Sequence, residues 1–224
     1  CVDAWDSNLA WSQMPVLSSS RPPPYLVQRK LKMSTPTSDP KIVVAHLTFL
    51  STVFNGQTLS RDALDDLMSS LRAVYRFLDG ELSLRRREMG PLLSSPDLPP
   101  LLCINQPPPY RSSLTSASST RTASTSSTVV VFVHPTNAFF DLEVSVPPLM
   151  YRVPHWLSHT SYSSILDVFN VGDLPSQTLC VEALCELAAV AGGTPLDETQ
   201  RAMACAVLEA LDAQLATRRT RTRG

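Results

Sequence analysis

The sequence predicts an α+β protein that is predominantly helical, and three observations support this class. Apolar residues recur at helical spacing within residues 41–90 and again within 174–216. Residues 129–146 instead hold the β-branched and aromatic runs that are typical of strands. The long segments between them are rich in Pro, Ser and Thr. We therefore expect two helical hairpins and a small β-hairpin, joined by extended Pro/Ser-rich segments.

Residues 1–40 are interpreted as an extended arm because they show no sustained apolar period. Three consecutive prolines, Pro22 to Pro24, favour a polyproline conformation, and Tyr25 follows them in position to lie along a partner. Trp5 and Trp11 are isolated aromatic residues in this arm. Two roles stay open for them: anchors on a neighbouring protein, or packing against the core of this chain.

Residues 41–90 predict the first helical hairpin. Asn55 and Gly56 form a turn pair, and Ser60 is a favourable N-cap for the second helix. Gly80 is placed to end that helix in a left-handed cap, with a further short helix over residues 81–89. His46 lies on the apolar face of the first helix, which indicates a hydrogen-bonded core histidine rather than a catalytic base.

The middle of the chain divides into two segments. Residues 91–128 contain frequent prolines and then a Ser/Thr-rich tract, which predicts a linker with neither helix nor central strand. Residues 129–173 predict a β-hairpin followed by an irregular aromatic segment. Its strands are Val129–Val133 and the alternating run from Phe139 to Val146, and the irregular segment contains Trp156.

Residues 174–216 predict the second helical hairpin. Gly192 and Gly193 end its first helix, and Thr194 is the expected N-cap of its second. Leu184 and Leu211 are central in the two apolar stripes, so we expect both to be buried. Residues 217–224 form a basic tail for which no regular structure is expected.

Motifs for catalysis are missing from the sequence. It contains no phosphate-binding glycine loop and no zinc-protease or serine-hydrolase motif. His155 and His159 would share one face of a helix, but Pro154 precedes them and no third metal ligand is obvious. The five cysteines follow no zinc or disulfide spacing, which favours a reducing intracellular compartment. We expect no catalytic, cofactor or metal site, and we interpret the chain as a non-enzyme.

Charge and length limit the partners. Of 224 residues only 17% are charged and the formal net charge is −1, which argues against a whole-surface electrostatic interaction with nucleic acid. No run reaches the roughly 18 apolar residues that a membrane-spanning helix needs. Arginines cluster at residues 85–87 and again at residues 218–223. Two roles stay open for these clusters: contact with an acidic partner or RNA, or only solubilising the chain. The candidate interaction residues are Trp5, Trp11, Tyr25, Arg85, Arg86, Arg87, Trp156, Arg218, Arg219, Arg221 and Arg223.

Long irregular segments bury little surface alone and become ordered when they lie along partners. The sequence therefore favours a non-catalytic structural or adaptor subunit of a larger protein assembly. Accessory subunits of organellar complexes are built in this way, so the mitochondrion is the first hypothesis for its location. The alternative is a peripheral, ribosome-like ribonucleoprotein subunit that contacts RNA through its arginine-rich segments.

Overall fold

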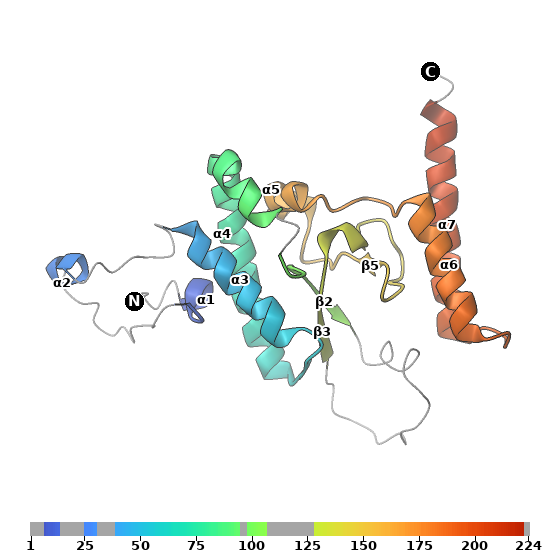
Figure 1. The fold of residues 1–224 in the computed structure, drawn as a ribbon, viewed down its shortest axis with the longest axis horizontal. Helices are drawn as coiled ribbons and strands as arrows, with labels where there is room; N and C mark the ends of the chain where they lie inside the picture. The colour runs from blue at the N-terminus through green and yellow to red at the C-terminus, as the bar shows by residue number, and fades with distance from the viewer. Residues whose placement is uncertain (1–6, 14–24, 31–38, 95–97, 107–127, 222–224) are drawn as a thin grey trace.

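The computed structural model describes residues 7–13, 25–30, 39–94, 98–106 and 128–221. It is an α+β protein in which helices predominate, as the sequence predicts (Figure 1). The helices are α1 (Ser7–Ala10), α2 (Tyr25–Lys30), α3 (Pro40–Phe54), α4 (Arg61–Leu93), α5 (His159–Phe169), α6 (Gln177–Ala191) and α7 (Glu198–Arg221). The strands are β1 (Thr58–Leu59), β2 (Leu102–Gln106), β3 (Thr128–Val133), β4 (Ala138–Phe139) and β5 (Tyr151–Arg152), with a short 3-10 helix over Pro135–Asn137.

Helices α3 and α4 pack against each other through the apolar stripes that the sequence contains. Asp39 caps α3 by accepting a hydrogen bond from the Lys41 amide. Ser60 caps α4, where its hydroxyl oxygen accepts from the Ala63 amide at 3.4 Å. The predicted start of the second helix is thus confirmed.

The predicted end of that helix at Gly80 is wrong, because α4 continues to Leu93. Leu78 and Leu82 on either side of Gly80 are both buried in the core. The carboxylate of Asp79 also accepts a hydrogen bond from the Ile165 amide of α5. These contacts on both sides of Gly80 outweigh the roughly 1 kcal/mol that a glycine costs inside a helix. The break comes instead at Arg85, whose backbone leaves helical geometry.

The predicted β-hairpin is also wrong in its pairing. Strand β3 lies in the centre of an antiparallel sheet of order β1-β3-β2. Its longest partner is β2, which lies inside the predicted linker, with Leu102 opposite Val133 and Ile104 opposite Val131. Between Phe139 and Val146 only β4 is a strand, and it pairs in parallel with β5. Residues 91–93 of the predicted linker also belong to helix α4, and its residues 95–97 and 107–127 lie outside the described residues.

The second helical hairpin is formed by α6 and α7, and Gly192 ends α6 with a positive φ of 57° as expected. The N-cap of α7 is Asp197 and not Thr194. The Asp197 carboxylate accepts from the Gln200 amide at 2.7 Å, and the Gln200 side chain accepts from the Asp197 amide at 3.1 Å. This reciprocal capping box lies three residues later than predicted. The Thr194 hydroxyl instead donates to the Ala191 carbonyl at the end of α6.

Both ends of the chain are more helical than the sequence suggested. The described parts of the predicted arm include α1 and α2, and α1 packs on α3 and α4 through Leu9 and Ala10. Extended backbone is therefore the wrong prediction for these residues. The backbone of the predicted unstructured tail continues α7 as far as Arg221. Helix propagation adds one hydrogen bond for each residue it fixes, which favours extension of an existing helix.

The core consists of two clusters. The larger contains the buried faces of α1, α3, α4, α5 and the three-stranded sheet. The smaller lies between the α6–α7 hairpin and the segment from Phe139 to Met150. The hairpin stands to one side of the main body in Figure 1. Among the helices that the structure describes, none combines the length and apolarity needed to cross a membrane.

Candidate functional site

The predicted interaction residues do not gather in one place. Trp5 and Arg223 lie outside the described residues. Tyr25 lies in helix α2, and helix α7 includes Arg218, Arg219 and Arg221. The structure describes the backbone of these four residues but not their side chains. The remaining candidates are Trp11, Trp156 and the three arginines after Gly80, and they occupy three separate environments.

Trp11 packs against this chain's own helix α3. Its ring is edge-on to His46 and to Phe49, with centroid distances of 5.3 and 5.7 Å. His46 is fully buried, and its Nδ1 atom lies 2.6 Å from the Ser12 hydroxyl. Burial lowers the pKa of His46 to about 4, while the Asn8 carbonyl opposes that shift. The interpretation of His46 as a hydrogen-bonded core histidine is confirmed. Trp11 remains 41% exposed, so this packing leaves part of its ring open to solvent.

Two of the three clustered arginines face carboxylates of this chain. Arg85 forms an ion pair with Glu81 one helical turn earlier. Arg86 lies 3.7 Å from a carboxylate oxygen of Asp167 in α5, and both side chains are more than half exposed. Such surface pairs contribute little to stability, but they reduce the positive charge presented outward.

Trp156 occupies the centre of an aromatic cluster that joins residues far apart in the sequence. Its ring stacks on Tyr75 of α4 at 5.6 Å and meets Tyr162 of α5 edge-on at 6.2 Å. The guanidinium carbon of Arg72 lies 5.9 Å from the Trp156 ring centroid, within cation–π range. The indole Nε1 is buried and has no hydrogen-bond acceptor among the described residues. Trp156 thus links the loop before α5 to both the core and the surface of α4.

Tyr75 connects this cluster to the sheet. Its hydroxyl donates to the Leu101 carbonyl and accepts from the Cys103 amide at 3.2 Å. Burial raises the pKa of the Tyr75 phenol well above its usual range, and it raises the pKa of the Cys103 thiol to about 12. A thiol with so high a pKa stays protonated at neutral pH, so Cys103 is unsuited to nucleophilic catalysis.

A groove of about 660 Å³ runs along the outer face of α4 beside this cluster. Asn8 of α1 and Trp156 contribute to its lining, together with α4 residues that include Asp65, Arg72 and Arg76. Its chemistry is mixed: two guanidinium groups, one carboxylate and apolar side chains. Such a groove suits a ligand that carries negative charge and apolar surface together.

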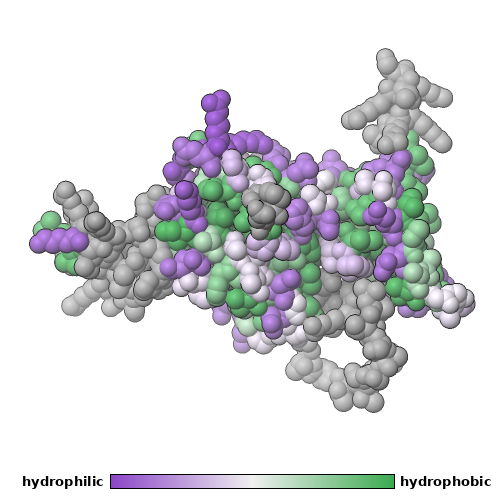
Figure 2. Space-filling view, in the orientation of Figure 1, coloured by the Kyte–Doolittle hydropathy of each residue, from purple (hydrophilic) through white to green (hydrophobic). Residues whose placement is uncertain are grey.

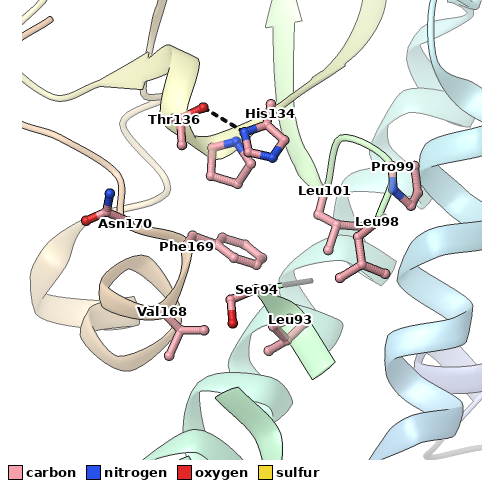
Figure 3. A pocket seen from close by; sticks show the side chains of 11 residues that line it. Leu93, Ser94, Leu98, Pro99, Leu101, His134, Thr136, Val168, Phe169 and Asn170 are labelled. Atoms are coloured by element: carbon pink, nitrogen blue, oxygen red, sulfur yellow. Dashed lines mark hydrogen bonds between the residues drawn. The ribbon is translucent and has the colours of Figure 1, made fainter. Parts of the chain in front are cut away.

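A second, smaller pocket of about 290 Å³ lies where the end of α4, the segment before β2, the 3-10 helix and the end of α5 meet. Its apolar lining includes Leu93, Leu101 and Phe169, and the Phe169 ring points into the space between the α4 end and the 3-10 helix (Figure 3). At its rim His134 Nδ1 lies 2.7 Å from the Thr136 hydroxyl. That bond spans two residues in a turn, a common local arrangement. The pocket has the size and apolar lining to hold a small apolar group.

Helix α7 carries an apolar stripe that we call the α7 stripe: Ala204, Leu208, Leu211 and Leu215. Leu208 is 52% exposed and Leu215 is 41% exposed. Leu211 was expected to be buried, but it is only half-buried, as is Leu184 on α6. The smaller side chains Ala183 and Ala210 take the buried positions instead. Apolar side chains are visible along the outer edge of this hairpin in Figure 2.

The two histidines four residues apart, His155 and His159, have no third metal ligand beside them among the residues that the structure describes. His155 is exposed in the loop, and His159 begins α5 with its ring 4.2 Å from that of Phe140. Within the described ranges, no group of three His, Cys, Asp or Glu side chains is placed to hold a metal ion.

No protein-family model, no curated protein sequence and no solved structure matches this chain.

Proposed function

We propose that this protein is a non-catalytic structural or adaptor subunit of a larger assembly, and that it docks a partner protein on the α7 stripe. The observation that supports this proposal is the exposure of Leu208 and Leu215 on a helix whose other face already packs on the protein core. That other face buries the side chains of Met203, Val207 and Ala210. A helix that is apolar on two sides normally has neighbours on both.

The spacing of the α7 stripe fits a helical partner. Its four residues follow intervals of four, three and four, which is the repeat of a coiled-coil seam. Helix α7 is also longer than α6, and its C-terminal part extends past the rest of the hairpin in Figure 1. Ala204 and Leu211 already pack in part against the smaller core cluster, so a partner helix along this part would bury mainly the exposed Leu208 and Leu215.

The ribonucleoprotein alternative has weaker support. Arg85 and Arg86 face Glu81 and Asp167, so part of their charge is already balanced within the chain. Binding by charge neutralisation requires arginines that reach phosphates. We therefore rank protein docking above RNA contact.

The test is a comparison of co-purifying proteins in cells that make the protein. We expect the double variant Leu208→Glu and Leu215→Glu to lose a stoichiometric partner, because buried carboxylates without partners are costly in an apolar seam. The matched control is Glu209→Ala with Asp212→Ala, which changes exposed polar residues on the same helix and should keep that partner. Retention of every partner by the leucine variant would contradict the proposal. Loss of the partner on ribonuclease treatment would instead support the RNA alternative.

A further inference from the structure

We propose that the groove along α4 binds a carboxylate-bearing segment of a partner protein, with Arg72 and Arg76 as the groups that recognise the carboxylates. This proposal goes beyond docking on the α7 stripe: it concerns a different surface, and it assigns that surface a partner of defined charge.

The sequence of α4 places four polar side chains along one face. Asp65, Ser69, Arg72 and Arg76 follow intervals of four, three and four, so they align over about three turns. All four belong to the lining of the groove. Asn8 of α1 contributes from another element, so the groove depends on α1 remaining packed against α4.

The two arginines of the groove make no direct ion pair within the described part of the chain. Arg72 and Arg76 are both exposed, and neither forms an ion pair there, in contrast to Arg85 and Arg86. A guanidinium group offers a planar fork of N–H donors that matches a carboxylate in bidentate geometry. Two guanidinium groups one helical turn apart could bind two carboxylates, or could bind one carboxylate from both sides.

Arg72 is held in place by the aromatic cluster. Its contact with Trp156 restricts the guanidinium without neutralising its charge. Trp156 is itself fixed by Tyr75 and Tyr162, and Tyr75 is bonded to the sheet. A charged group on a rigid support loses less conformational entropy when it binds, which increases affinity.

The negative end of the groove defines the class of ligand. Asp65 would repel a continuous polyanion such as RNA, and the net charge of −1 adds no attraction for one. Leu64 and Met68 add apolar surface near Asp65. A peptide with carboxylates next to an apolar side chain satisfies both parts of the groove, whereas a sugar–phosphate chain satisfies only the arginines.

The test uses a synthetic ten-residue peptide of alternating Glu and Leu that carries an uncharged fluorophore. Its binding to the full chain is followed by fluorescence anisotropy. We expect saturable binding to the unmodified protein, and a loss of affinity of about tenfold or more in the double variant Arg72→Ala and Arg76→Ala. The control Arg61→Ala removes an exposed arginine of α4 outside the groove and should change affinity less than about twofold.

Three results would overturn the proposal. One is binding weaker than about 1 mM, which leaves too little free energy for specific recognition. Another is an equal loss of affinity in Arg61→Ala, which would show a non-specific charge effect. The last is displacement of the peptide by a ten-nucleotide RNA at lower concentration than by unlabelled peptide. The variant of Leu208 and Leu215 should bind the peptide normally, so failure at the groove is distinguishable from failure at the α7 stripe.

Discussion

The Tyr75 hydroxyl donates a hydrogen bond to the carbonyl of Leu101, with 2.5 Å between the two oxygen atoms. The same hydroxyl accepts a hydrogen bond from the Cys103 amide, so this one side chain joins α4 to the beginning of strand β2. The face of the Tyr75 ring supports Trp156 beside the groove. The interior of the fold and the proposed binding surface therefore share this residue.

We expect Tyr75→Phe to lower the free energy of unfolding by about 1–3 kcal/mol, because a fully buried carbonyl and amide lose this hydroxyl as a partner. Urea denaturation measures the change. Ser83→Ala is the control, since the Ser83 hydroxyl bonds at an exposed position and its loss should cost under about 0.5 kcal/mol. Equal effects in the two variants would contradict the role assigned to Tyr75.

Gly80→Ala should raise the free energy of unfolding by about 0.5–1 kcal/mol. Gly80 lies inside α4, and an added Cβ atom at this position would meet no atom within 4 Å. Thermal unfolding measures the gain. Gly192→Ala is the contrasting variant, because its positive φ strains any other residue, and it should lose stability. A loss of stability in Gly80→Ala would instead support the interpretation of Gly80 as a left-handed helix cap.

Stability should fall in mild acid because of His46. Its pKa is about 4 in the folded protein and about 6.5 in the unfolded chain, so the unfolded state binds the proton more tightly. The contribution of His46 is complete above pH 6.5 and is lost as the pH falls toward 4. We expect a loss of about 1–2 kcal/mol in the free energy of unfolding at pH 5 relative to pH 7. In urea titrations at both pH values, His46→Gln should lose most of this difference, whereas His134→Gln should keep it.

The two faces of the α6–α7 hairpin should respond differently to truncation. Leu187→Ala removes a side chain that is 9% exposed and should cost about 2–4 kcal/mol. Leu208→Ala removes one that is 52% exposed and should cost less than about 1 kcal/mol. Chemical denaturation of the isolated full chain compares them. Equal small losses would mean that the hairpin is not packed on the segment from Phe139 to Met150.

Local signals were enough to predict the class of the fold and several helix ends. Ser60 and Gly192 are examples, because a cap depends on residues that are close in the sequence. Gly80 and Thr194 also have the local chemistry of helix caps, but neither acts as the predicted cap. Tertiary contacts beside Gly80 keep α4 helical there, and the capping box of Asp197 and Gln200 starts α7 after Thr194.

Long-range partners could not be predicted. Strand β2 is short and lies among prolines, so nothing local identified it as the partner of β3. The groove could not be predicted for the same reason. Trp156 stood out in the sequence as an aromatic residue, but its contact with Arg72 joins positions that are 84 residues apart. A helical period was visible within residues 174–216, but that period alone did not show which side of α7 packs on the core and which side carries the exposed leucines.

The most direct test of the adaptor proposal is the rate of maleimide labelling at Cys205. This thiol is exposed and lies one turn from Leu208 on α7, so a partner on the α7 stripe would shield it. Mass spectrometry of the labelled peptides separates it from the other cysteines, and Cys103 is a buried control that should stay unlabelled in the folded chain. We predict labelling at least about tenfold slower in gently lysed source cells than in the isolated chain. The fast rate should return in the variant of Leu208 and Leu215. The same fast rate in both settings would contradict docking on the α7 stripe.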